Sequence, residues 1–169
     1  GWCPGNTLAD NCIGHTFCVL GVAYILTNEG NVTDTDVIQA ALLHDTVEDT
    51  DTSLAEIESV FGARVCAIVA EVTDDKSLPK AERKRQQVAH AAHASRGAKL
   101  VKLADKLYNV RDLARATPAG WDAARVAEYV AWAERVVRGL RGVNALMERA
   151  LDEAFAAAGV EVAKGSPGE

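Results

Sequence analysis

Apolar residues recur at three- and four-residue steps along much of the chain, and this spacing predicts helices. The clearest stretch has five apolar residues on one helical face: Leu100, Leu103, Leu107, Val110 and Leu113. Further helices are predicted over about 19–28, 36–46, 53–61, 65–72, 80–94 and 121–158, the last bent at Gly139 or Gly142. Ser53 and Glu56 form a capping box at the start of one of them. No strand pattern or internal repeat stands out, so we predict an all-α fold.

The composition agrees with packed helices in one domain. The chain has 169 residues, of which 49% are hydrophobic and only 5% aromatic, so Ala, Leu and Val must fill the core. Residues 1–16 show no periodicity and are interpreted as a leader, while 159–169 contain Gly, Ser and Pro and are interpreted as a flexible tail. The folded domain is therefore predicted over 17–158.

Four ionisable residues gather directly behind an apolar run in the first half of the chain. They are His44, Asp45, Glu48 and Asp49, and in a helix each of the first two would share a face with the residue four positions on. Burying such a group is costly unless something compensates its charge, and a divalent metal would do so. The alternative is a helix end that continues into an acidic surface loop.

A second polar pair lies in the leucine-rich helix. Asp105 and Asn109 are four residues apart, between leucines of the core face. Asp105 is either a metal ligand or the partner of a nearby base, Lys102 or Arg111. One histidine and two aspartates from two helices form a mixed nitrogen and oxygen set, which suits Mn²⁺, Mg²⁺, Fe²⁺ or Zn²⁺.

Charge is distributed unevenly along the chain. From residue 29 to 75 there are twelve acidic residues and one basic residue, and from 76 to 115 eleven basic and three acidic. Both segments could simply be solvated helix faces. Alternatively, they are the two halves of one site that hydrolyses a polyphosphate, in which a metal activates water and Lys and Arg side chains neutralise the phosphates. The net charge of −6 disfavours non-specific binding to nucleic acid.

Two blocks of the sequence resemble a known family. They are "ALLHDTVEDTDTSLAEIESVFGARVCAIVAEVTDDKSLPKAERKRQQV" and "GAKLVKLADKLYNVRDL". They resemble the HD-domain hydrolases of the RelA/SpoT group, and most of all its small, stand-alone metazoan SpoT homologues, over roughly 21–159. The resemblance implies a single HD-domain helical bundle. It also implies Mn²⁺-dependent hydrolysis of the 3′-pyrophosphate of guanosine tetraphosphate (ppGpp), and removal of phosphate from NADPH.

The resemblance also implies roles for individual residues. The metal ligands would be His44, Asp45 and Asp105, and the carboxylates that activate water would be Glu48 and Asp49. The residues that contact nucleotide would be Lys80, Asn109 and Tyr129. The residues themselves leave alternatives open: either carboxylate could only orient His44, Asn109 could make an interhelical hydrogen bond, and Tyr129 could belong to the core.

The chain departs from the family at Cys18, which aligns with a ligand histidine on an earlier helix. A thiolate binds Zn²⁺ or Fe²⁺ but is a poor partner for Mn²⁺. His15 is a candidate replacement ligand, and the leader does not match the family's basic N-terminal segment. The alternative function is therefore a degenerate member that binds nucleotide with weak or no catalysis. A helical interaction module is a third hypothesis.

The predicted cellular setting follows from the cysteines and the apolar runs. Four cysteines in a chain of this size do not resemble a disulfide framework, and no signal-peptide pattern is present. The longest early apolar run, 17–26, is about half a membrane span. We expect a cytoplasmic protein with reduced thiols that binds a small nucleotide and neither nucleic acid nor membrane.

Overall fold

The computed structural model describes residues 18–160, which form helices and connecting turns without any strand. The α-helices are α2 (Thr35–Leu43), α3 (Thr46–Asp49), α4 (Leu54–Phe61), α5 (Ala63–Val72), α6 (Lys80–His90), α7 (Arg96–Arg115), α8 (Ala123–Leu140) and α9 (Ala145–Ala157). Residues 18–24 are also helical and continue into a π-helical turn, η1 (Ile25–Glu29); a 3₁₀ turn, η2 (Ala91–His93), follows α6. The predicted all-α fold is confirmed. The predicted leader, 1–16, and residues 161–169 of the predicted tail lie outside the described residues.

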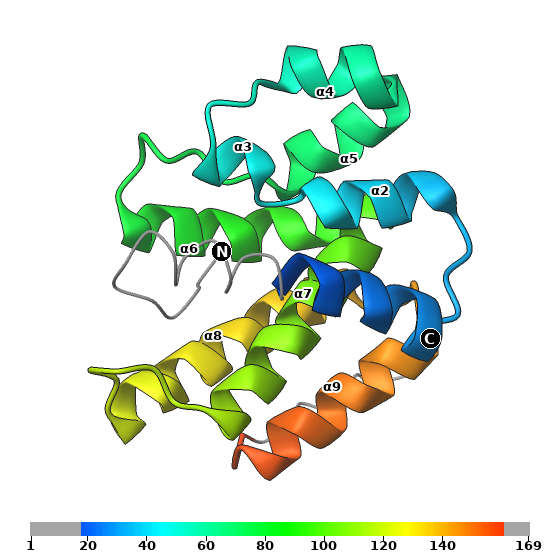
Figure 1. Cartoon of the computed structure of the whole chain (residues 1–169). Helices are drawn as coiled ribbons and strands as arrows, with labels where there is room; N and C mark the ends of the chain where they lie inside the picture. The colour runs from blue at the N-terminus through cyan, green and yellow to red at the C-terminus, as the bar shows by residue number, and fades with distance from the viewer. Residues whose placement is uncertain (1–17, 161–169) are drawn as a thin grey trace.

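Helix α7 is the centre of the fold. It packs against α2, α5, α8, α9 and η1. In Figure 1 it runs through the middle of the molecule, with α4 and α5 at the top of the view and α8 and α9 at the bottom. The predicted leucine stripe explains the central position of α7. Leu103 and Leu107 are fully buried, and Leu100, Val110 and Leu113 are nearly so. In the part of the chain described, no helix is both long and apolar enough to cross a bilayer.

Local sequence signals fix several helix ends. The Asp34 side chain caps α2, and Ser53 with Glu56 forms the predicted capping box of α4. Gly62 ends α4 at a φ of 89°, in the region that favours glycine. Gly142, at a φ of 93°, lies between α8 and α9, so the predicted helix over 121–158 is two helices rather than one bent helix.

The helix predicted over 36–46 is also interrupted. Helix α2 ends at Leu43, and the chain turns through His44 and Asp45 before α3 begins at Thr46. The backbone of Asp45 has φ −99° and ψ −5°, away from regular helical values. This turn moves the His44 and Asp45 side chains off the regular helical stripe and towards the interior.

A close helix contact brings the first described helix onto α7. Gly21 lies directly against the ring of Tyr108, where a Cβ atom would overlap the ring. One helical turn earlier on each helix lie Cys18 and Asp105. The missing side chain at Gly21 therefore permits the approach that places Cys18 beside Asp105.

Candidate functional site

His44 presents one ring nitrogen to the backbone and the other to two carboxylates. Its Nδ1 lies 2.7 Å from the Ala41 carbonyl oxygen, and because a carbonyl only accepts, Nδ1 is the donor. In the neutral ring, Nε2 then carries a lone pair. Nε2 lies 3.3 Å from Asp45 Oδ2 and 3.8 Å from Asp105 Oδ1.

This cluster is buried, which excludes the surface-loop alternative for its first two members. His44 is 6% exposed and Asp45 is 5% exposed. Within the described residues, the buried Nε2 atom makes no hydrogen bond. Acceptors that face one another away from water require a cation between them, so the donor set fits a divalent metal.

Asp105 is held from within its own helix. Lys106 Nζ lies 2.7 Å from its Oδ2, and Asn109 donates to its Oδ1 at 2.7 Å. Burial alone would raise the pKa of Asp105, but the charge and the hydrogen bond of the Lys106 ammonium outweigh burial and lower it, so the carboxylate stays charged. The basic residue that pairs with Asp105 is thus Lys106. Arg111, one of the two predicted partners, pairs with Glu29 instead.

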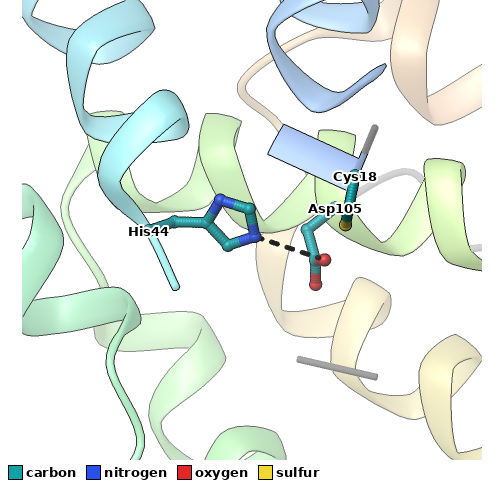
Figure 2. Close-up of side chains that lie close together, drawn as sticks. All are labelled: Cys18, His44 and Asp105. Atoms are coloured by element: carbon teal, nitrogen blue, oxygen red, sulfur yellow. Dashed lines mark ion pairs between the residues drawn. The ribbon is translucent and has the colours of Figure 1, made fainter. Parts of the chain in front are cut away.

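Cys18 joins two of the predicted ligands. One ligand atom each from Cys18, His44 and Asp105 lie within 4.8 Å of one another, and Cys18 is only 3% exposed. Figure 2 shows the three side chains converging from three separate segments. Cys18, which aligns with a ligand histidine of the family, therefore lies beside His44 and Asp105. The alternative ligand His15 lies outside the described residues.

The two carboxylates of α3 have different surroundings. Glu48 lines the central cavity, and its Oε1 accepts a hydrogen bond of 2.8 Å from the Asp74 main-chain NH. Asp49 pairs with Lys76 at 2.8 Å and, among residues 18–160, is not part of the cavity lining. The Lys76 ammonium also binds the main-chain carbonyl of Glu48. The structure thus separates two residues that the sequence treated as a pair.

The cavity next to the cluster has a volume of about 600 Å³ and is lined from both charge segments. One side holds the predicted metal ligands His44, Asp45 and Asp105 together with Glu48. Its basic side chains are Lys80, Arg83, Lys84, Lys102, Lys106 and Arg125. Predicted nucleotide contacts Lys80, Asn109 and Tyr129 all line it. Asn109 donates to Asp105 within α7, and its side chain also interacts with Tyr129 on α8, so its predicted interhelical contact is present as well.

Sequence reasoning missed the aromatic wall of this cavity. Trp121 and Trp132 flank Tyr129, with ring centroids 6.0 and 5.3 Å away, and Arg125 lies over the Trp121 ring at 4.4 Å. Arg125, Tyr129 and Trp132, at steps of four and three residues, lie on one stripe of α8, and Trp121 lies just before the start of that helix. The chain has few aromatic residues, so their close spacing in this segment was the sequence signal that could have indicated the aromatic wall. Lys84 and Lys106 both lie over Trp132, at 5.2 and 5.0 Å.

Comparison with known proteins places this geometry in a family. Residues 11–133 match the HD domain family. The guanosine-3′,5′-bis(diphosphate) 3′-pyrophosphohydrolase MESH1 of Danio rerio is 66% identical, over 85% of this chain and 79% of that protein. The Homo sapiens MESH1 is 62% identical, over 85% of this chain and 80% of that protein.

A solved structure supports the same relationship. The one described as "A metazoan ortholog of SpoT hydrolyzes ppGpp and plays a role in starvation responses" has a TM-score of 0.85 and 52% identity, over 88% of this chain and 83% of that one. The fold, the buried HD pair and these similarities agree. The chain therefore belongs to the HD-domain family, among the MESH1-type guanosine-3′,5′-bis(diphosphate) 3′-pyrophosphohydrolases.

Proposed function

We propose that this chain hydrolyses the 3′-pyrophosphate of ppGpp, releasing GDP and pyrophosphate, in a metal-dependent reaction. The observation that carries the proposal is the buried cluster of His44, Asp45 and Asp105 beside a cavity of about 600 Å³ rich in lysine and arginine. The MESH1 proteins that bear this activity in their names are 62–66% identical to this chain over most of its length.

The three residues His44, Asp45 and Asp105 are the proposed holders of the metal. Mn²⁺ is the ion implied by the family, with Zn²⁺ and Fe²⁺ as alternatives that the same donors accept. When bound, such an ion polarises a phosphoryl oxygen and lowers the pKa of water. Lys106 and Asn109 keep Asp105 charged and oriented for that task.

Glu48 is the proposed general base. Its Oε1 is anchored by the Asp74 main-chain NH, which fixes the carboxylate at the cavity wall. A fixed carboxylate can take a proton from the attacking water as the water oxygen bonds to phosphorus and the bond from that phosphorus to the ribose 3′-oxygen breaks, which leaves the 3′-hydroxyl of GDP and free pyrophosphate. Asp49 is proposed to assist this proton transfer indirectly. It binds the Lys76 ammonium, which also binds the main-chain carbonyl of Glu48.

The remaining lining suits a polyphosphorylated nucleotide. Lys80, together with Arg83 and Lys84, supplies cations for phosphate oxygens. The aromatic side chains Trp121 and Tyr129 offer faces on which a purine base can stack. Asn109, which donates one amide hydrogen to Asp105, is the proposed donor to a phosphate or ribose oxygen of the nucleotide.

The test is turnover of ppGpp by the purified chain while Mn²⁺ is titrated. We expect GDP and pyrophosphate to appear in equal amounts only when metal is present. NADPH, the second substrate implied by the resemblance, is assayed in parallel for release of inorganic phosphate. Metal binding without turnover of either compound would reject the proposal.

A second candidate, a degenerate nucleotide-binding protein, is favoured by one observation. Cys18 lies in the metal cluster at the position of the family's histidine. This candidate predicts saturable binding of ppGpp without release of pyrophosphate. An interaction module would show neither binding nor turnover, so the same two measurements separate all three hypotheses.

A further inference from the structure

We propose that the Cys18 sulfur is a metal ligand and that it makes this a zinc site, distinct from a site that prefers Mn²⁺. The inference deepens the proposed function, since it concerns the ion held by the same cluster. Cys18 is the position at which this chain departs from the ligand set that its resemblance implies.

The position of Cys18 supports ligation. Its thiol is buried in the same polar cluster as His44 and Asp105, with ligand atoms within 4.8 Å of one another. His44 Nε2 and Asp105 Oδ1, 3.8 Å apart, are already within the span of about 4 Å that two bonds to one Zn²⁺ can bridge. The contact of Gly21 with Tyr108, one turn away on both helices, holds the first helix against α7 at this point.

A second observation points to an ion independently of the cysteine. The His44 side chain is more than nine-tenths buried, and its Nε2 makes no hydrogen bond within the described residues. Because Nδ1 is committed to the Ala41 carbonyl, Nε2 directs a lone pair into the same space as the sulfur. A buried lone pair beside a thiol and carboxylates is the environment of a metal ligand.

The chemistry of the donors then selects the ion. Binding through sulfur releases the thiol proton to solvent and leaves a soft thiolate donor. Thiolates favour Zn²⁺, whereas Mn²⁺ favours oxygen donors and is the weakest binder of the first-row divalent series. The Lys106 ammonium beside Asp105 offsets part of the added negative charge.

The experiment uses Co²⁺ as a spectroscopic probe of the whole chain. A cobalt–thiolate bond gives a near-ultraviolet charge-transfer band that nitrogen and oxygen donors do not give. We expect the band in the wild-type protein and in C3S/C12S/C66S, which keeps Cys18 as its only thiol. We expect it to be absent from C18S and C18H. The single variant C66S is the matched control, because Cys66 lies on α5 and bonds to the Leu54 carbonyl.

Competition titrations with Zn²⁺ and Mn²⁺ give the second readout. C18S should weaken Zn²⁺ binding by at least about 10- to 100-fold, the loss that removal of an outer-shell partner already produces. C18H should tighten Mn²⁺ binding and lower the ratio of Zn²⁺ to Mn²⁺ affinity. Helical content measured by circular dichroism confirms that each variant is folded.

The outcomes separate this inference from the proposed function. No charge-transfer band in wild type, or equal Zn²⁺ affinity in wild type and C18S, would overturn the role of Cys18 even if ppGpp is hydrolysed. A band that disappears only when Cys18 is replaced, in a protein without hydrolysis under any metal, would keep this inference and reject the proposed function.

Discussion

Asp105 is the residue on which the metal site and the buried charges both depend. Its carboxylate faces His44 on one side and the Lys106 ammonium on the other. Replacing it by Asn removes the ligand charge but also leaves Lys106 buried without its counter-charge. Breaking a buried pair in this way costs about 3–5 kcal/mol.

We therefore predict that Asp105→Asn loses hydrolysis and stability together, while Asp105→Asn with Lys106→Met regains stability and stays inactive. Met has a similar length to Lys and suits the apolar surroundings beside Trp132. Urea unfolding and ppGpp turnover of both variants measure the two effects. Wild-type turnover in either variant would show that Asp105 is no ligand.

Glu48 and Asp49 give a sharper residue-scale test because their surroundings differ. Glu48→Gln keeps an oxygen to accept the Asp74 hydrogen bond but cannot take a proton. We predict that it keeps metal affinity and loses about 10²- to 10⁴-fold in kcat. Asp49→Asn, which weakens the contact with Lys76, is the matched control and should lose far less. An equal loss in both would make Asp49 a direct participant.

At the scale of elements, sequence periodicity predicted the helices well and their interruptions poorly. The leucine stripe of α7 and the capping box of α4 are local signals, so they could be read directly. The turn at His44 and Asp45 could not, because no glycine or proline marks it and the contact of His44 with Asp105 on α7 is not visible in the local sequence. The same reason explains why Asp49 could not be separated from Glu48 by spacing alone.

Packing between elements gives a prediction that neither element shows alone. Gly21 lies against Tyr108, and Gly139 lies against η2, where a Cβ would be 2.7 Å from the Ala91 Cβ. Both Gly→Ala changes should destabilise the fold by about 1–3 kcal/mol through overpacking. Only Gly21→Ala should also weaken metal binding, because it pushes Cys18 away from Asp105. Equal metal affinity in the two variants would show that the Gly21 contact does not position the site.

At the scale of the whole molecule, two oppositely charged segments meet around one cavity. Residues 29–75 supply His44, Asp45 and Glu48 to the cavity wall, and 76–115 supply Asp105 and most of the cations. The charge asymmetry of the sequence thus corresponds to two segments that line one cavity. The aromatic wall from Trp121 to Trp132 completes the cavity, and it could not be assigned before the α7 and α8 helices were known to pack together.

Because the proposed metal ligands come from three separate segments, metal binding should stabilise the entire fold. An ion that binds only the folded state adds about 2.7 kcal/mol at a concentration one hundred times its Kd. For a chain of this length each kcal/mol raises Tm by about 2–4 °C, so saturating Zn²⁺ should raise Tm by roughly 5–10 °C. Scanning fluorimetry before and after treatment with a chelator measures this shift.

Glu48→Gln should retain the shift, since Glu48 is proposed to act on water and not on the ion, whereas Asp105→Asn with Lys106→Met should lose it. A shift that survives in the Asp105 variant would place the ion elsewhere in the molecule, and loss of the shift in Glu48→Gln would make Glu48 a ligand.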